Sequence, residues 1–452
     1  MQQPTREELL AWDRWHVWHG FTQMAEYEPL VLVEAQGCRV RDLDGRWYLD
    51  GVASLWCNVH GHRHPRLDAA IRAQLDRVAH VTNLGVSNVP SILLARRLAQ
   101  LAPAGLEHVF FSDSGATAVE VALKMAFQYW RQRPNPKPEK TRFLALAEAY
   151  HGDTIGSVSV GGVELFHAIF RPLLFECFRA PAPDTYRTPP GVPTEQLAAY
   201  YLQQVENILQ QHHQEIAAMI VEPLVQCAAG ILVHPPGFLR GVRELTRQYD
   251  VLLIADEVAV GFGRTGRMFA CQQEDVQPDF LCLAKGLTGG YLPMAATLTT
   301  TEIWNAFLGR YEENRTFFHG HTYGGNPLAA AVALANLELF EQERLLESLP
   351  PKIDRLRQHL ERIGRLEHVG HVRQCGMIAG IELVQDRATK TAYPRAERRA
   401  WRVCLQARTE GVLLRPLGDV VVIFPPLAIS LEELDFLCQV IERSIAAICE
   451  EG

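Results

Sequence analysis

Short apolar runs alternate with amphipathic stretches through the middle of the chain. The runs have the length of strands, and the stretches between them place apolar residues at helical spacing. Strands that alternate with helices indicate a mostly parallel sheet with both faces covered. The strands predicted in this way cover residues 108–111, 142–147, 217–221, 251–255, 280–284 and 295–299. The helices predicted with them cover residues 116–130, a polar stretch ending near residue 213, and residues 328–340.

The two ends of the chain have fewer strand signals. Strands are predicted at residues 376–383 and 412–415, and a final helix begins at about residue 431. Near the N-terminus, residues 41–46 (Arg-Asp-Leu-Asp-Gly-Arg) form a predicted hairpin turn. These signals favour a smaller α+β unit to which both chain ends contribute.

The length of the chain, 452 residues, is too great for one simple core and favours two domains. We expect an α/β fold with a large domain over residues 63–334. The small domain is expected to combine residues 1–62 with residues 335–452.

Composition narrows the classes of protein to consider. With 48% apolar and 21% charged residues, the chain is globular, and its formal net charge of −8 argues against a nucleic-acid partner. It has no run of 18 apolar residues, and residues 1–18 lack the apolar centre of a signal peptide. Its ten cysteines form no Cys-x-x-Cys pair, so no metal site or disulfide framework is indicated. We therefore expect a cytoplasmic protein without a nucleic-acid partner or a membrane span.

Lys285 is the first candidate for chemistry. It ends the apolar run of residues 279–285 and precedes the glycine-rich residues 286–290. An amine between a buried strand and such a turn loses hydration, which lowers its pKa and makes it a nucleophile toward carbonyl groups. A surface lysine after an ordinary strand is the alternative interpretation.

A carboxylate ends a second apolar run, at Asp256 and Glu257. A strand-end amine and a strand-end acid are the pair that pyridoxal phosphate (PLP) requires, because the amine binds the aldehyde and the acid keeps the pyridine nitrogen protonated. Side chains alternate between the faces of a strand, so only one of the two acids faces the cofactor. Val258 shares the face of Asp256 and is expected to pack on the ring.

A phosphate site is predicted where a strand passes into a helix at Ser114, Gly115 and Ala116. A glycine-bearing turn at a helix N-terminus supplies N–H donors and positive potential. Such turns are often only helix caps, but this one shares a sheet edge with Lys285, where open α/β sheets bind ligands. Thr322, in a second glycine-rich turn, is a further hydroxyl donor to phosphate.

Two aromatic or histidine-rich segments remain. Tyr150 follows a strand directly within Tyr-His-Gly-Asp-Thr and is placed to stack on a pyridine ring, although a buried turn tyrosine fits the pattern equally well. Residues 60–65 (His-Gly-His-Arg-His-Pro) have no zinc spacing and no acidic or cysteine neighbour, so we expect a loop and no metal.

These motifs resemble the signature of the class III aminotransferases, PLP enzymes of fold type I. The matching segments are residues 253–258 (Leu-Ile-Ala-Asp-Glu-Val), residues 261–266 (Gly-Phe-Gly-Arg-Thr-Gly) and Lys285-Gly286. The resemblance extends over essentially the whole chain. It implies a large domain with a mostly parallel sheet and a small domain from both chain ends.

The resemblance also implies how the cofactor is held. Lys285 binds PLP and moves the proton, while Asp256 pairs with the pyridinium. The backbone N–H groups of Gly115 and Ala116 bind the phosphate, and Tyr150 stacks on the ring.

The substrate residues follow from the same resemblance. Arg415 pairs with a substrate carboxylate, for which its guanidinium fork is suited. Phe21, Trp56 and Gly320 line the substrate site together with Tyr150 and Lys285. Thr322 reaches the phosphate in the neighbouring subunit, which implies a homodimer.

Finer features are similar to the biotin-pathway members of the family, among them residues 113–115, 150–154 and 414–418. They imply transamination of 8-amino-7-oxononanoate to 7,8-diaminononanoate, with S-adenosylmethionine as donor. Two departures favour lysine as a different donor: Leu55 precedes Trp56 where a tryptophan pair is common, and Phe21 replaces a common tyrosine. The motifs are also compatible with an ω-aminotransferase, an aminomutase or a PLP-binding scaffold without catalysis.

Overall fold

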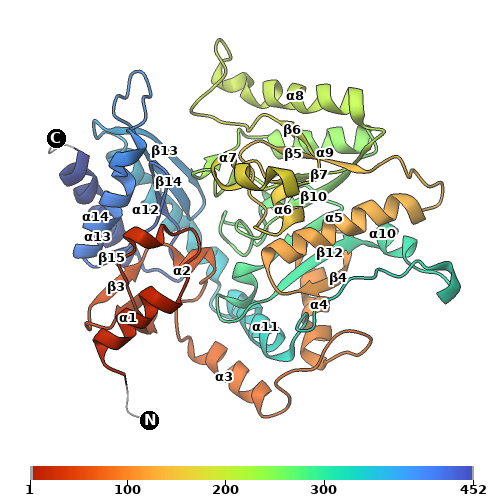
Figure 1. Cartoon of the computed structure of the whole chain (residues 1–452), viewed down its shortest axis with the longest axis horizontal. Coiled ribbons are helices and arrows are strands. Elements are labelled where there is room, and N and C mark those ends of the chain that lie inside the picture. The colour runs from red at the N-terminus through yellow and green to blue at the C-terminus, as the bar shows by residue number, and fades with distance from the viewer. Residues whose placement is uncertain (1–3, 450–452) are drawn as a thin grey trace.

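The computed structural model describes residues 4–449 and contains a seven-stranded central sheet (Figure 1). Its strand order is β4-β12-β11-β10-β7-β5-β6, and only β12 runs antiparallel to its neighbours. The strands are β4 (Leu106–Ser112), β5 (Arg142–Leu146), β6 (Phe178–Ala180), β7 (Ile216–Val221), β10 (Leu252–Asp256), β11 (Phe280–Leu283) and β12 (Ala295–Thr300). The predicted α/β fold with a mostly parallel sheet is therefore confirmed.

The three middle strands, β7, β10 and β11, are apolar apart from Asp256 at the end of β10, because helices cover both faces of the sheet. Every residue of β7, β10 and β11 is buried, as expected for parallel strands inside an α/β domain. Their register pairs Ala255 with both Val221 and Leu281, which brings the carboxyl ends of the three strands to one edge. This edge carries the candidate site.

All three helices predicted for this part of the chain are present, as α5 (Gly115–Gln132), α8 (Leu197–His212) and α11 (Pro327–Gln342), and α5 begins one residue earlier than expected. Ser114 and Thr117 form a capping box at its start, and its buried face packs on β11 and β12. The helix α11 packs against α3 (Pro65–Leu75) and α4 (Val89–Leu101), two helices from earlier in the chain. The other helices here are α6 (Ile155–Val160), α7 (Glu164–His167), α9 (Phe238–Gln248) and α10 (Thr301–Ala306).

Both ends of the chain build the smaller unit, which lies on the left in Figure 1, where red N-terminal and blue C-terminal elements meet. The strand β15 (Val412–Leu413) pairs in parallel with β3 (Trp47–Asp50), and the predicted turn at residues 41–46 joins β2 (Arg39–Asp42) to β3. The other elements from the chain ends are α1 (Arg6–His16), β1 (Leu32–Gln36), α2 (Ala53–Trp56), α12 (Leu345–Ile363), β13 (Val369–Cys375), β14 (Ile378–Leu383), α13 (Arg399–Thr409), β16 (Pro416–Leu417), β17 (Val420–Ile423) and α14 (Leu431–Cys449). From the middle of the chain, β8 (Val225–Gln226) and β9 (Leu232–Val233) form a separate two-stranded sheet.

Two details differ from the sequence expectations. The strand expected from residue 376 begins at Ile378, because Gly376 has a positive φ of 61° and turns the chain between β13 and β14. The strand expected at residues 412–415 is shorter, because β15 ends at Leu413 and Arg415 lies in the connection to β16. The domain boundaries at residues 62 and 334 stay a prediction, and α11 continues through the second.

A search of the helices within residues 4–449 finds none that is both long and apolar enough to cross a membrane.

Candidate active site

A cavity of about 720 Å³ opens at the carboxyl edge of the central sheet. It lies where β4, β10 and β11 end, the usual place for ligands in open α/β sheets. Eight of the residues predicted from the sequence line it: Trp56, Ser114, Gly115, Ala116, Tyr150, Asp256, Val258 and Lys285. Four others, Phe21, Gly320, Thr322 and Arg415, do not.

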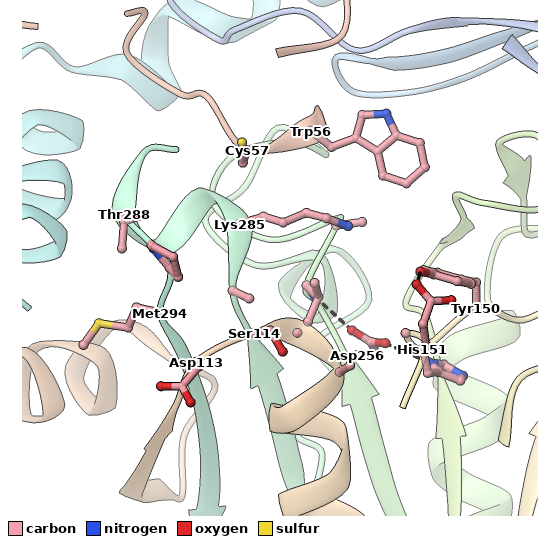
Figure 2. Close-up of a pocket in the computed structure, with 18 of the residues that line it drawn as sticks. Trp56, Cys57, Asp113, Ser114, Tyr150, His151, Asp256, Lys285, Thr288 and Met294 are labelled. Carbon is pink, nitrogen blue, oxygen red and sulfur yellow. Dashed lines mark hydrogen bonds and ion pairs between the residues drawn. The ribbon is translucent and has the colours of Figure 1, made fainter. Parts of the chain in front are cut away.

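Lys285 projects across the middle of this cavity, beneath Trp56 and above Asp256 (Figure 2). It follows β11 with a positive φ of 44°, which turns its side chain off the line of the strand. Its Nζ lies 4.9 Å from the centre of the Trp56 ring, and Trp56 in turn stacks on Phe424 at 5.3 Å. The amine therefore meets an apolar aromatic wall on one side.

The Trp56 wall rests on an unusual backbone. Ala53, Ser54 and Trp56 all have positive φ, a conformation that costs energy in residues with a side chain. Arg264, fully buried, lies 4.5 Å from the Phe424 ring and donates to the carbonyl oxygens of Asn58 (2.6 Å) and Pro425. These contacts tie the segment that carries Trp56 to the rest of the fold.

Asp256 is held as an acceptor at the floor of the cavity. Its Oδ2 accepts from Nδ1 of His151 at 2.7 Å, and its Oδ1 accepts from the backbone N–H of Val258 at 3.0 Å. Both contacts hold the carboxyl group in place through its two oxygens. Asp256 is therefore positioned to pair with a cationic ring nitrogen.

Glu257 faces the opposite side of β10, as strand alternation requires. Its oxygens accept from the backbone N–H groups of Ala270 (2.6 Å) and Cys271 (2.8 Å). Burial raises the pKa of Glu257 to about 7. The structure thus separates a cavity acid from a structural acid at adjacent positions.

The N-terminus of α5 forms another wall. The first backbone N–H groups of a helix have no hydrogen-bond partner inside the helix. Here the N–H of Thr117 donates to Oγ of Ser114, and Gly115 and Ala116 line the cavity. A Cβ on Gly115 would lie 2.5 Å from Cγ1 of Val258, and a Cβ on Gly152 would lie 2.4 Å from that of Ala116. The two glycines keep this corner open for an anion.

Tyr150 is positioned at both its ends. Its hydroxyl donates to Oδ2 of Asp153 at 2.7 Å, and its backbone N–H donates to Oε1 of Glu222 at 3.0 Å. Burial, followed by the bond to Asp153, raises the pKa of the Tyr150 hydroxyl, so it stays protonated. The ring is thereby fixed at the edge of the cavity.

Sequence reasoning missed several residues of this wall, chiefly His151, Asp153 and Glu222. Glu222 comes directly after the apolar strand β7, as Asp256 comes at the end of the apolar run of β10, so the strand-end argument would have found it. Burial raises the pKa of Glu222 to about 7. His151 and Asp153 belong to the Tyr150 motif, but nothing in the sequence distinguishes them from turn residues.

The four predicted residues outside the cavity lie around it. Thr322 and Gly320 are exposed in the segment before α11, and Phe21 is 59% exposed with its ring 5.2 Å from that of Phe166. Arg415 is half-buried, and among residues 4–449 its guanidinium has no hydrogen-bond or ion-pair partner. Their assigned roles stay predictions.

The histidine-rich segment makes contacts with protein groups. His62 Nε2 lies 3.0 Å from Asp50 Oδ2, and His64 Nε2 lies 3.1 Å from Glu343 Oε1. His60 is buried, with Nε2 3.2 Å from the carbonyl oxygen of Asn336. The segment fastens the N-terminal region to the end of α11.

Comparison with known proteins agrees with this geometry. The aminotransferase class-III family profile matches residues 22–445. The adenosylmethionine-8-amino-7-oxononanoate aminotransferase of Geobacter sulfurreducens is 56% identical, with 98% of each chain covered. The crystal structure of the enzyme of the same name from Methanocaldococcus jannaschii has a TM-score of 0.93 at 42% identity, covering 98% of this chain and 100% of that one.

An (S)-enantioselective omega-transaminase from Thermomicrobium roseum is also similar. Its crystal structure has a TM-score of 0.93 at 37% identity, covering 99% of this chain and 100% of that one. Aminotransferases of this kind depend on PLP, and their family is generally homodimeric. The family match spans nearly the whole chain and includes every residue of the cavity, so this protein belongs to the class III aminotransferases.

Proposed function

We propose that the chain transfers an amino group to 8-amino-7-oxononanoate, forming 7,8-diaminononanoate, with S-adenosylmethionine as the donor. The observation that carries this proposal is a cavity with the amine, the acid and the helix N-terminus that PLP needs, in a chain 56% identical to a relative of that name. Lys285, Asp256 and the start of α5 converge on one space.

The cavity offers a group to each of three parts of the cofactor: an amine for the aldehyde, a carboxyl group for the ring nitrogen and an open corner for the phosphate. The amine of Lys285 stands over the carboxyl group of Asp256, which His151 and Val258 hold by hydrogen bonds. Gly115 leaves a corner that a Cβ would fill, where helix N–H groups meet the phosphate. When bound, PLP supplies an aldehyde that receives an amino group from one substrate and passes it to another.

The chain's own residues then have distinct tasks. Nζ of Lys285 would take the proton from the donor's Cα and later deliver one to C7 of the oxo-acid. With PLP bound, Asp256 would hold the proton on the ring nitrogen, Tyr150 would stack on the ring and Val258 would pack on it. Trp56 keeps water from the reacting carbon.

Recognition of the oxo-acid carboxylate is assigned to Arg415. Arg415 is half-buried, and its guanidinium has no hydrogen-bond or ion-pair partner in the part of the chain that the structure describes. Its donors are therefore available to bind the carboxylate of a ligand. Phe21 and Gly320 belong to the same proposed substrate site.

We also propose a homodimer in which Thr322 reaches the phosphate in the neighbouring subunit. Thr322 is exposed and lies outside the cavity of its own chain, which is compatible with a role toward a second copy. A cytoplasmic location is inferred from the composition alone.

The test is an incubation of the PLP-loaded protein with 8-amino-7-oxononanoate and one donor at a time, with products identified by mass. Amination with S-adenosylmethionine is expected. Amination with lysine but not with S-adenosylmethionine would show that the proposed donor is wrong and the proposed acceptor is right.

The likeness to the Thermomicrobium enzyme favours a second candidate function, that of an ω-aminotransferase. Amination of simple ketones by ornithine or 4-aminobutyrate, without reaction of the oxo-acid, would establish that candidate instead.

A further inference from the structure

Phe166 joins two residues that belong to the proposed substrate site. Its ring lies 5.2 Å from that of Phe21 at an interplanar angle of 71°, and 6.3 Å from that of Tyr150 at 87°. Tyr150 lines the cavity, Phe166 is half-buried and Phe21 is 59% exposed. The three rings therefore form a continuous aromatic surface leading outward from the cavity.

His167, the next residue on α7, supports this surface from behind. Its ring is nearly parallel to that of Tyr150, at 14° and 6.4 Å between centres. A Cβ on Gly161 would lie 2.5 Å from Cε1 of His167, so the histidine occupies a space that this glycine leaves open. Burial lowers the pKa of His167, which leaves the ring neutral near pH 7. It adds no positive charge to the surface.

The chemistry of the surface suits a cation. Aromatic faces attract positive groups through their quadrupoles, and the carboxylate of Asp153 lies beside the Tyr150 hydroxyl. The N-terminal segment supplies less aromatic area than a tryptophan pair would, since Leu55 precedes Trp56 and the Trp56 ring already faces Lys285. Phe166, far away in the sequence, provides a ring that this segment lacks.

We propose that Phe166 is a specificity-determining residue for the amino donor, and that with Phe21 and Tyr150 it receives the donor's positively charged group. The inference rests on the proposed function, because that function requires a cationic donor: a sulfonium in S-adenosylmethionine or a side-chain ammonium in lysine.

The experiment compares Phe166→Leu with Phe170→Leu as matched control. Phe170 lies four residues further on, is 46% exposed and takes no part in the contacts of Phe166. The enzyme is converted to its pyridoxamine phosphate form, in which a donor binds without reacting. Calorimetry then measures the Kd of S-adenosylmethionine and of S-adenosylhomocysteine, which lacks the sulfonium charge. Lysine and norleucine form a second charged and uncharged pair.

Phe166→Leu is expected to weaken binding of the charged member of one pair about ten-fold and to leave its uncharged partner unchanged. Phe170→Leu should change neither. Unchanged affinity for both cations, or equal losses for charged and uncharged members, would overturn the proposal. Turnover of 8-amino-7-oxononanoate is measured separately with wild type. Its absence would remove the proposed function, whereas a charge-dependent loss in Phe166→Leu would still identify the cation surface.

Discussion

At the scale of single residues, Asp256 and Glu257 show how one peptide bond separates two carboxylates with different surroundings. Asp256 faces the cavity and accepts from His151, whereas Glu257 faces the core and accepts from backbone N–H groups. The alternation of side chains along β10 produces this division. The sequence predicted that only one of the two acids faces the site, and the structure places Asp256 in the wall of the cavity.

The first prediction concerns these two acids in catalysis. Asp256→Asn should retain the fold and lose about a hundred-fold or more in kcat, because a neutral amide does not hold the ring proton. Glu257→Gln should stay close to the wild-type kcat. Steady-state kinetics on both PLP-loaded variants gives the answer. A large loss in Glu257→Gln with little in Asp256→Asn would show that the acids are wrongly assigned.

The second prediction concerns stability and pH. The pKa of Glu257 is about 7 in the native state and about 4.3 when unfolded, so the native state binds more protons between these values. The stability that this group contributes is complete below about pH 4.3 and declines as the pH rises toward 7, by about 4 kcal/mol at most. Urea unfolding at pH 5 and pH 8 should show a smaller decline for Glu257→Gln than for wild type. Equal declines would contradict the assignment.

At the scale of elements, the apolar pattern was sufficient for the strands that hold the site. β7, β10 and β11 are uninterrupted apolar runs, and their ends position Glu222, Asp256 and Lys285. The direction of β12 could not be predicted, because an apolar run carries no information on its orientation. The backbone of residues 53–56 was equally inaccessible, since its positive φ angles fall on residues that rarely adopt them.

Contacts between elements far apart in the sequence were the other feature that the sequence did not predict. The Phe21–Phe166 contact joins segments 145 residues apart (166 − 21), and neither residue stands in a recognisable motif for it. The N-terminal cap of α5 was easier to predict, because Ser114 followed by an amphipathic helix is a local signal in the sequence. Local chemistry was predictable, whereas long-range packing of single side chains was not.

The third prediction tests the corner formed by α5 and β10. In Gly115→Ala the new methyl group meets Val258, so the helix N-terminus must shift and PLP should bind roughly five- to thirty-fold more weakly. Adding Val258→Ala should restore part of this affinity, because it removes both Cγ atoms. Fluorescence titration of the cofactor-free proteins with PLP measures the effect, and Val258→Ala alone is the control. No loss in Gly115→Ala would exclude this corner as the phosphate site.

At the scale of the whole molecule, both chain ends meet in one small α+β unit beside the central sheet (Figure 1). The pairing of β15 with β3 joins the ends, and the cavity draws on residues from Trp56 to Met294. An enzyme assembled in this way is expected to couple cofactor binding to the association of subunits through Thr322.

The fourth prediction follows from that coupling. Thr322→Ala should weaken PLP binding by about 1 kcal/mol, the usual net value of one hydrogen bond. PLP should also shift the monomer–dimer equilibrium of wild type toward dimer in sedimentation velocity, and less so in the variant. Thr409→Ala, an exposed threonine on α13, is the control. A monomer that binds PLP as tightly as the dimer would refute the role across the interface.

The most direct test of the central claim, that this cavity carries PLP on Lys285, is reductive trapping. The PLP-loaded protein is treated with borohydride, digested and analysed by mass spectrometry, with Lys285→Ala as control. The account predicts the reduced cofactor on the peptide that contains Lys285 and none on the variant. Cofactor trapped on a different lysine of the wild-type protein, or none at all, would contradict it.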